Sequence, residues 1–315
     1  MPKVSVIIPV YNAEKTLVAC ASNLVNQTYQ NIELIFVNDA STDGSLQILL
    51  DCEKQFSDRV IIVDLAENSG PGGARNAGLT YATGEYLGFC DSDDMVDVTM
   101  YEKLIKRAVE TDADMVDAAY YDEATDTCIL QTADELCGVL DDTKKSELIA
   151  GGGYLWSRVF KRDLFDGIRF REKTILEDME VMMELFMRCN RLENLHDVLY
   201  KYRKNSESAS KPRDVFLYHG YVKAAIRAVA ECEGRYEALR PAFEYSIAHL
   251  YEGGLSNLMN AANLSDSDKE PMIRELYELR KKYIQTGFRD NPYVRRKIGS
   301  NVLTVFDEVD RHYMG

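Results

Sequence analysis

The sequence lacks any apolar run close to the roughly 20 residues that a membrane-spanning helix needs. It has seven cysteines but no Cys-x-x-Cys pair, so neither a zinc site nor a disulfide framework is indicated. Signal-peptide features are also missing, because Met1-Pro2-Lys3 leads directly into a predicted strand. We therefore expect a soluble, cytoplasmic protein with reduced thiols.

Positive charge is also in short supply. The chain has 37 Lys and Arg against 52 Asp and Glu, a formal net charge of −15. This balance argues against nucleic acid as the main partner. It leaves open a nucleotide that is held through a metal ion.

The first half of the chain alternates predicted strands with predicted helices. Short β-prone runs bounded by polar turns indicate strands, and segments with apolar residues on one face indicate helices. This spacing predicts βαβ units and a mostly parallel sheet with helices on both faces. The predicted strands are at 4–9, 32–37, 59–65, 86–90 and 115–121. The predicted helices are at 14–26, 45–56 and 100–111, with a further helix that the glycine-rich loop 68–73 opens and that runs to about residue 83.

The second half is less regular and ends in helices. Residues 122–142 show little periodicity and indicate either a loop or a ragged pair of strands. A helix is predicted at 179–188 and a strand at 195–202. From 214 onward the pattern is helical, with helices predicted at 215–233, 236–262, 267–285 and 293–309, and a short helix is also predicted at 144–150. We expect an α/β domain over residues 1–212 and a helical C-terminal region over 213–315.

The predicted strand at 86–90 stops abruptly in the acids Asp91-Ser92-Asp93-Asp94. A strand of an α/β sheet delivers the residues that follow it to the crevice where ligands bind. Two carboxylates at this spacing suit a hard divalent cation such as Mg²⁺ or Mn²⁺. The alternative is a surface turn with helix-capping acids.

Polar clusters also follow the other predicted strands, at 9–12, 38–39 and 67–68. Because the carboxyl ends of parallel strands share one edge of the sheet, these clusters should converge on one site.

The glycine-rich stretch Gly70-Pro71-Gly72-Gly73-Ala74-Arg75 resembles a dinucleotide fingerprint only in part. Arg75 occupies the third glycine position, where close helix–strand packing excludes a bulky side chain. A phosphate-binding loop is excluded by the lack of Gly-Lys-Ser/Thr. Two interpretations of Arg75 are compatible: contact with a diphosphate at the helix N-terminus, or a salt bridge to a sheet-edge acid such as Asp91.

Six motifs follow one another in the first 94 residues: Val6-Ile7-Ile8-Pro9-Val10-Tyr11-Asn12, Val37-Asn38-Asp39-Ala40-Ser41-Thr42-Asp43-Gly44, Glu67-Asn68-Ser69-Gly70, Ala74-Arg75-Asn76-Ala77-Gly78, Gly84-Glu85-Tyr86 and Asp91-Ser92-Asp93-Asp94. In this order they resemble the motifs of the family 2 glycosyltransferases, which are inverting, nucleotide-sugar-dependent enzymes of the GT-A fold. The resemblance is dense over residues 4–94. It implies a GT-A domain with a nucleotide-sugar-binding half at about 1–121 and an acceptor half at about 122–212.

The resemblance also implies roles for single residues around a UDP-sugar. Asp93, with Asp91, would hold the Mn²⁺ or Mg²⁺ that bridges the diphosphate, and Asp91 would also face the ribose. For Tyr11 the alternative is packing, and for Asp39 and Asp43 it is turn and cap duty. The remaining donor-binding residues implied are Pro9 and Tyr11 beside the base, Asp39 on the uracil ring, Asp43 and Asn68 near base and ribose, and Arg75 by the diphosphate.

In the acceptor half, Glu177 and Asp178 open a predicted helix, where its dipole alone would favour acids. The resemblance implies that Asp178 is the general base for the acceptor hydroxyl, with Glu177 orienting the pair or the acceptor. Physical reasoning from the sequence does not distinguish the two neighbouring acids. Trp156, the only tryptophan, is either a packing residue or an acceptor contact. Low-specificity candidates near the donor phosphates are Tyr202, Arg203 and Ser208, whereas Arg158 receives no role.

The expected activity is transfer of a sugar to a glycan or lipid-linked saccharide acceptor in cell-surface or capsular polysaccharide synthesis. The basic clusters 280–282 and 295–297 are either solvated helix faces or a peripheral contact with the inner face of the membrane. Two other functions stay open: a nucleotidyltransferase that makes nucleotide sugars, and a non-catalytic sugar-nucleotide-binding module.

Overall fold

The computed structural model describes residues 1–174, 176–203, 237–260, 264–284 and 289–313. They fall into two compact units. The sheet unit comprises Met1–Asp141 and Gly153–Ser208, and the helical unit comprises Asp142–Gly152 and Ala209–Gly315. The domain boundary expected at about 212 lies outside the described residues.

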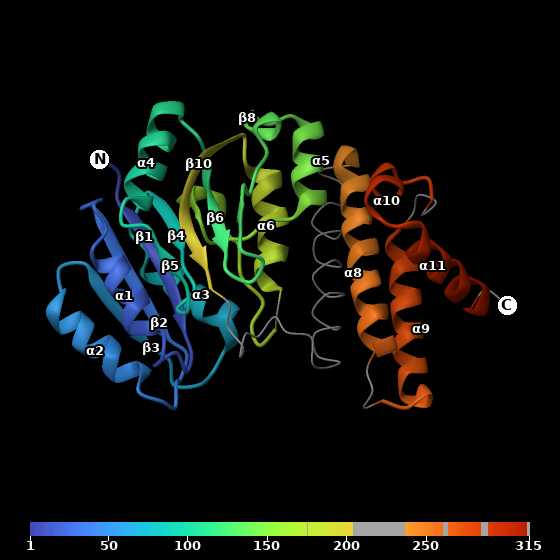
Figure 1. Ribbon diagram of the computed structural model, residues 1–315, viewed down its shortest axis with the longest axis horizontal. Coiled ribbons are helices and arrows are strands. Elements are labelled where there is room, and N and C mark those ends of the chain that lie inside the picture. Colours follow the sequence, from blue (N-terminus) through green and yellow to red (C-terminus); the bar gives the residue numbers. More distant parts are fainter. Residues whose placement is uncertain (175, 204–236, 261–263, 285–288, 314–315) are drawn as a thin grey trace. The chain divides into compact units, whose positions relative to one another are not determined.

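One large sheet forms the centre of the sheet unit (Figure 1). Its strand order is β3-β2-β1-β4-β9-β6-β10-β5, with β7 paired to β6 and β8 to β10. The pairs β1–β2, β1–β4, β2–β3 and β6–β10 are parallel. The strands are β1 Val4–Val10, β2 Ile32–Asn38, β3 Val60–Asp64, β4 Tyr86–Phe89, β5 Met95–Val96, β6 Met115–Asp122, β7 Thr127–Ile129, β8 Gly138–Val139, β9 Arg158–Lys161 and β10 Arg191–Tyr202.

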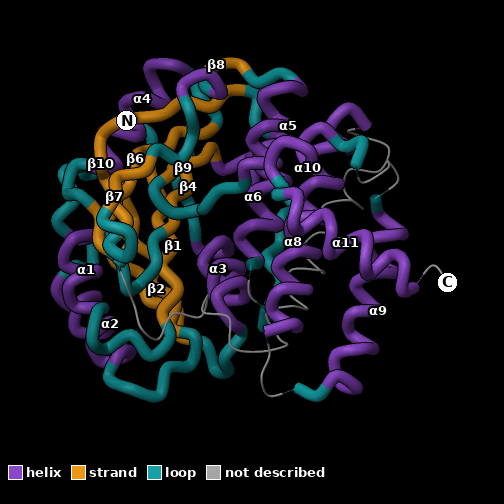
Figure 2. The backbone as a smooth tube through the Cα atoms, turned by 45° about the vertical axis from the view of Figure 1, so that its right-hand side comes forward, coloured by secondary structure: helices purple, strands orange, loops and turns teal. Residues whose placement is uncertain are grey.

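Helices cover both faces of this sheet. Buried residues of α1 and α4 share a core with the β1 side chains Val4, Val6 and Ile8. On the opposite face, Gly78 of α3 lies directly against Ile7, and Figure 2 shows α1 and α2 on one side of the strands and α3 and α6 on the other. The expected mostly parallel α/β architecture is confirmed. The helices are α1 Leu17–Val25, α2 Ser45–Gln55, α3 Gly70–Tyr81, α4 Met100–Thr111 and α6 Glu177–Arg188.

Outside residues 122–142, which contain β7 and β8, two strands were not predicted. β9 inserts antiparallel between β4 and β6, and the two-residue β5 pairs antiparallel with the end of β10. Both segments are too short to carry a recognisable period in the sequence. As a result, the sheet is mixed rather than purely parallel on its β6–β10 side.

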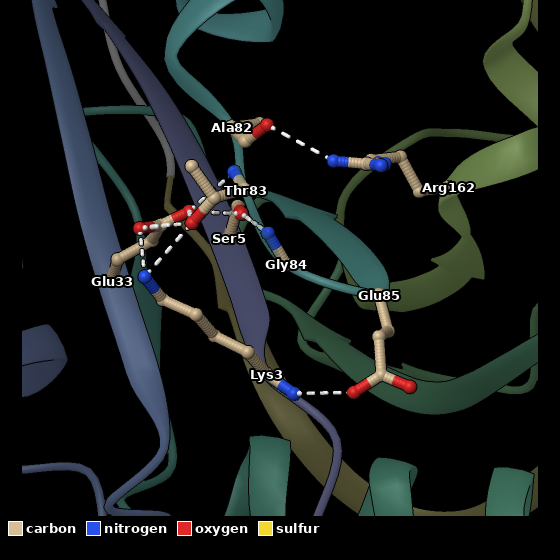
Figure 3. Close-up of polar contacts among 8 residues, drawn as sticks. All are labelled: Lys3, Ser5, Glu33, Ala82, Thr83, Gly84, Glu85 and Arg162. Atoms are coloured by element: carbon tan, nitrogen blue, oxygen red, sulfur yellow. Dashed lines mark hydrogen bonds and ion pairs between the residues drawn. The ribbon is translucent and has the colours of Figure 1, made fainter.

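A polar network fixes the start of β4 at the amino edge of the sheet (Figure 3). Glu33, in β2, is 5% exposed and accepts hydrogen bonds from the Thr83 amide (2.7 Å) and hydroxyl (3.0 Å), while also contacting the Ser5 hydroxyl and the Lys3 ammonium. The Gly84 amide donates to Ser5 Oγ at 2.8 Å. A Cβ on Gly84 would lie 2.7 Å from the Lys3 carbonyl oxygen, so this position requires glycine. The network thereby sets the register of β4. The other end of this strand leads, at the opposite edge of the sheet, into the turn Asp91-Ser92-Asp93-Asp94, which we call the acidic turn.

The helical unit confirms most of the predicted C-terminal helices. Those expected at 144–150, 236–262 and 267–285 are present, whereas 215–233 lies outside the described residues. The single helix expected at 293–309 is wrong, because the chain breaks at Ile298 and Gly299, where glycine weakens helical structure. The helices are α5 Asp142–Gly151, α8 Arg240–Asn260, α9 Asp266–Tyr283, α10 Pro292–Lys297 and α11 Ser300–Tyr313.

The basic clusters 280–282 and 295–297 are largely engaged within this unit. Arg280 is 7% exposed, contacts a carboxylate of α11 and lies over aromatic rings. Arg296 donates to both carboxylate oxygens of Glu147 at 2.7 Å. These cations therefore serve ion pairs inside the fold. No helix in the described part of the chain combines the length and apolar character needed to cross a bilayer.

Candidate active site

Two distant parts of the sheet unit meet at one guanidinium. Arg75, on α3, is 5% exposed. Its Nη2 lies 3.1 Å from Asp91 Oδ1, beyond the end of β4, and its Nη1 contacts Glu177, the first residue of α6. The salt bridge between Arg75 and Asp91 that the sequence left open is confirmed. Through Arg75, the acidic turn after β4 and the start of α6 are joined in one cluster.

The charges around Arg75 act on one another. Removal from water raises the pKa of Asp91, and the charges of Asp93 and Asp178 raise it further, while Arg75 lowers it. Burial of Arg75 would lower its pKa, but the charges of Glu177, Asp91 and Asp178 together outweigh burial and raise it. The predicted site acids Asp91, Asp93, Glu177 and Asp178 are therefore close enough to form one electrostatic cluster.

The neighbours Glu177 and Asp178 lie in different environments. Glu177 is 4% exposed, and burial raises its pKa to about 7 despite the contact with Arg75. Asp178 is half-buried, and its Oδ1 accepts a hydrogen bond from the Met179 amide at 2.9 Å. Leu176, with φ of 66°, turns the chain into the helix. Of the two acids, only Asp178 is open enough to meet a substrate hydroxyl.

The donor set for a metal ion is small. Asp91 and Asp93 share the turn after β4, and the described residues contain no group of three or more His, Cys, Asp or Glu side chains arranged to hold a metal ion. Mg²⁺ is commonly bound by one or two carboxylates, with phosphate oxygens and water completing its shell. The chemistry of Asp91 and Asp93 fits such a partly coordinated cation.

The fourth residue of the motif, Asp94, has a separate environment that sequence reasoning missed. It is 1% exposed; its Oδ2 accepts from the Tyr200 hydroxyl at 2.7 Å and its Oδ1 from the Arg203 amide at 2.8 Å. Burial and the charge of Asp91 raise its pKa to about 8. Its adjacency to the Asp-Ser-Asp motif was the only signal in the sequence. Of the other donor-loop candidates, Ser208 lies outside the described residues.

Asp39 and Asn68 lie together at the edge formed by β1 and β2. Asp39 is 2% exposed, and its Oδ1 accepts from the Ser69 amide at 2.7 Å. The Asn68 side chain donates to the Asp39 carbonyl at 3.3 Å. Burial raises the pKa of Asp39, against the hydrogen bonds from Ser69 and Gly70. The structure thus brings these two predicted residues together, with Asp39 already fixed by the chain.

The other residues predicted to bind the nucleobase differ in how available their side chains are to a ligand. Asp43 uses both carboxylate oxygens on backbone amides, those of Glu14 (3.0 Å) and Ser45 (2.9 Å), which is turn and cap duty. Tyr11 is 52% exposed, so packing does not explain it. Pro9 is half-buried within β1. Tyr11 therefore has a surface to offer a ligand, and Asp43 acts through the loop it holds.

Close packing against a neighbouring backbone segment explains why the stretch 70–73 is rich in glycine. A Cβ on Gly72 would lie 2.1 Å from the Arg171 carbonyl oxygen, and the Lys173 amide donates to the Ser69 carbonyl at 2.8 Å. Asn76 on α3 exchanges two hydrogen bonds with the Phe170 backbone, at 2.8 and 2.9 Å. The glycines therefore allow the segment before α6 to lie against α3, which places Glu177 beside Arg75.

Trp156 is a packing residue in this structure. It is 5% exposed and stacks with Tyr154, Tyr200 and Tyr202 at centroid distances of 4.6, 4.7 and 5.4 Å. Tyr154, at the end of this group, is 45% exposed. The ring that reaches the surface is thus that of Tyr154.

Arg158, for which no role is predicted from the sequence, is fully buried beside Asp117. Its Nη2 lies 3.3 Å from Asp117 Oδ2, and its Nε donates to Gln131 Oε1 at 3.2 Å. Gln131 in turn donates to the Trp156 carbonyl at 2.8 Å. The pair holds the backbone of the aromatic segment, and a lone arginine in a sequence carries no signal of a partner 41 residues away.

The comparisons with known proteins place the chain in the class of glycosyltransferases. The sequence profile described as glycosyl transferase family 2 matches residues 5–164. The glycosyltransferase GlyG of Streptococcus pneumoniae is 30% identical over 244 residues, 73% of this chain and 80% of GlyG. The chain belongs to glycosyl transferase family 2.

Other relatives are matched over less of their length. The chain covers 64% of the uncharacterized glycosyltransferase EpsJ of Bacillus subtilis, at 31% identity over 67% of the chain, and 39% of the S. pneumoniae glycosyltransferase GlyA. Among solved structures, S. aureus TarS 1-349 in complex with UDP-GlcNAc superposes with a TM-score of 0.70 at 21% identity, over 88% of this chain and 80% of the other. This similarity confirms the α/β fold and its helical C-terminal region.

Proposed function

We propose that this protein is an inverting glycosyltransferase of the GT-A type that moves a sugar from a UDP-sugar to an acceptor hydroxyl. The observation that supports this most is the Arg75 cluster, which joins the acidic turn to the start of α6. A glycosyl transfer needs a site for the departing diphosphate and a base for the nucleophile, and this edge of the sheet carries candidate residues for both roles.

Asp178 is the proposed general base. It is half-buried beside Glu177, which is committed to Arg75. A carboxylate at this point accepts the proton of the acceptor hydroxyl as the oxygen attacks the anomeric carbon, from the face opposite the leaving nucleotide. Glu177 holds the start of α6 in place through Arg75, and is a positioning residue.

Asp93 and Asp91 are the proposed ligands of Mn²⁺ or Mg²⁺. When bound, the ion would neutralise charge on the departing diphosphate. Asp91 is already oriented by Arg75, so the turn is prepared for a cation before substrate arrives. On the nucleoside side, we assign Tyr11, Asp39 and Asn68 to the base and ribose, with Pro9 beneath them and Asp43 supporting the loop.

The names of structural neighbours support the choice of donor. S. aureus TarS has been crystallised with UDP-GlcNAc and with UDP, and the mannosyltransferase PcManGT from Pyrobaculum calidifontis with GDP-Man and Mn²⁺, at a TM-score of 0.58. These complexes favour a nucleoside diphosphate sugar as the donor, bound together with a divalent metal ion. We propose a hexose-type sugar as the transferred group and a cell-surface glycan or lipid-linked saccharide as the acceptor.

We place the protein in the cytoplasm, where nucleotide sugars would reach it. The basic clusters give little support to a peripheral membrane contact, because Arg280 and Arg296 are engaged in ion pairs within the helical unit. A lipid-linked acceptor would then be met by the active site rather than by a basic surface.

The base assignment is tested by Asp178→Asn. The variant should bind UDP as the wild type does but lose transfer by about 10²–10⁴-fold, the usual contribution of a positioned acid–base group. Sugar transfer is followed as UDP release with a panel of UDP-sugars and saccharide acceptors, with Asp163→Asn, an exposed acid, as control. Retention of most activity by Asp178→Asn would remove it as the base.

The two other functions make different predictions. A nucleotidyltransferase would release pyrophosphate from a nucleoside triphosphate and a sugar phosphate, and the segment after β1, Pro9-Val10-Tyr11-Asn12, is not a glycine-rich phosphate loop. A non-catalytic module would bind UDP and release no sugar with any metal, donor and acceptor.

A further inference from the structure

The Tyr200 hydroxyl is tied to both ends of the acidic turn. Tyr200 lies on β10 and is 1% exposed. Its oxygen accepts a hydrogen bond from the Asp91 amide at 3.3 Å, and its hydroxyl donates to Asp94 Oδ2 at 2.7 Å. A phenolic hydroxyl can do both at once, whereas a phenylalanine ring can do neither.

The turn itself is closed between the same two residues. The Asp94 amide donates to the Asp91 carbonyl at 3.2 Å, and the second oxygen of Asp94 accepts from the Arg203 amide at 2.8 Å. Ser92 and Asp93 lie between these two fastened positions. The position of the Asp93 carboxylate therefore depends on how firmly Asp91 and Asp94 are held.

The Tyr200 ring has little freedom to move. It stacks on Trp156 with a centroid distance of 4.7 Å and an interplanar angle of 16°, and it belongs to the core of the sheet unit. Its hydroxyl is consequently presented at a fixed point, 109 residues along the chain from Asp91. A group that is rigid, buried and bonded to both ends of a ligand-bearing turn is suited to preorganise that turn.

We propose that Tyr200 is a positioning residue for the metal–diphosphate site, acting through Asp91 and Asp94 to hold Asp93 where a divalent cation can bind. This inference rests on the proposed function, because it needs the turn to bind a metal–UDP complex. Tyr200 touches neither the metal nor the donor. Its loss should change how much metal the site requires, and leave the catalytic step nearly intact once metal is saturating.

The test compares Tyr200→Phe with Tyr101→Phe. Tyr101 is also fully buried in the same core, but its hydroxyl has no hydrogen-bond partner among the described residues. For each protein, the half-saturating Mn²⁺ concentration is measured for UDP binding by calorimetry and for UDP release from a UDP-sugar. Tyr200→Phe should raise this concentration about tenfold, the effect of losing the two hydrogen bonds of its hydroxyl, with the maximal rate within about threefold; Tyr101→Phe should leave it unchanged.

A second variant covers the case in which Tyr200→Phe does not fold. In Asp94→Asn the side-chain oxygen can still accept a hydrogen bond from the Arg203 backbone amide. The new side-chain NH₂ group faces Tyr200 and must donate to its hydroxyl oxygen, which reverses the direction of the present hydrogen bond. It then competes with the Asp91 backbone amide for that oxygen. The half-saturating Mn²⁺ concentration should again rise.

The outcomes separate the two proposals. If the wild type binds UDP in a metal-dependent way and both variants keep its half-saturating Mn²⁺ concentration, the positioning role is wrong and the proposed function stands. An equal rise of the half-saturating Mn²⁺ concentration in Tyr101→Phe would also overturn the positioning role, since the loss of any buried hydroxyl would then have the same effect. If the wild type shows no metal-dependent UDP binding, both proposals fail.

Discussion

At the scale of single residues, the site depends on one arginine shared by two acids. Arg75 contacts Asp91 and Glu177, and Asp178 also acts on it through its charge. Burying a charge is costly unless it is paired, so each partner keeps the others in place. A change at Arg75, Asp91 or Glu177 should therefore disturb both halves of the site.

The sequence identified which residues gather here, but not how each is used. The order of motifs implied Asp91, Asp93, Glu177 and Asp178. Only the structure separates Glu177, buried against Arg75, from its half-buried neighbour Asp178. The difference depends on which face of α6 packs on α3, and adjacent residues of a sequence carry no record of that.

Glu33 provides a prediction about stability. Burial alone would raise its pKa, but hydrogen bonds from Lys3, Ser5 and Thr83 outweigh burial and lower it. A carboxyl with a lowered pKa in the folded state stabilises the fold above its ordinary value of 4.5, and this stabilisation is lost as pH falls through the folded value. Glu33→Gln should lower the free energy of unfolding by about 1–3 kcal/mol at pH 7, as expected for hydrogen bonds to a charged group.

The difference between wild type and Glu33→Gln should shrink at pH values below 4.5, and urea unfolding at pH 7 and pH 3.5 measures it. Glu85→Gln is the matched control, because Glu85 is exposed and should change stability by no more than about 0.5 kcal/mol. An equal loss at both pH values would show that the charge of Glu33 plays no part.

At the scale of elements, the approach of the segment before α6 to the start of α3 decides whether the two halves of the site meet. Helix–strand alternation predicted α3 and α6 closely. It did not predict that Gly72 touches the backbone at Arg171, because such contacts depend on tertiary packing. The same limitation explains β9, whose four residues join β4 to β6 without a periodic pattern.

Gly72→Ala tests this contact. The added Cβ would lie 2.1 Å from the Arg171 carbonyl oxygen and 3.1 Å from Glu177 Cγ, so the segment must move away from α3. The chain should still fold, but sugar transfer should fall about 100-fold, since small displacements in a catalytic arrangement can cost this much. UDP release and thermal unfolding are measured in parallel.

Gly151→Ala is the control for this substitution, because a Cβ there meets nothing within 4 Å and its backbone does not require glycine. It should retain full transfer and stability. Normal activity in Gly72→Ala would mean that the glycine-rich stretch does not position α6.

At the scale of the whole molecule, strands alternating with helices were enough to predict the sheet unit, and helical periodicity was enough to predict most of the helical unit. It was harder to predict which segments of the chain belong to which unit. Asp142–Gly152 belongs to the helical unit although it interrupts the sheet unit in sequence, and a short helix in a chain gives no indication of which core it will join. The basic clusters 280–282 and 295–297 likewise could not be distinguished from a lipid-binding surface until their partners were visible.

The central claim is that a divalent metal ion held by the acidic turn binds the diphosphate of a UDP-sugar. The most direct measurement is the initial rate of UDP release from a panel of UDP-sugars, by wild type with Mn²⁺, by wild type with EDTA, and by Asp93→Asn with Mn²⁺. The account predicts release from at least one UDP-sugar by the wild type, and a loss of about 100-fold or more both with EDTA and in Asp93→Asn, since the charge of the leaving diphosphate is then uncompensated. UDP release that persists with EDTA and is unaffected by Asp93→Asn would contradict it.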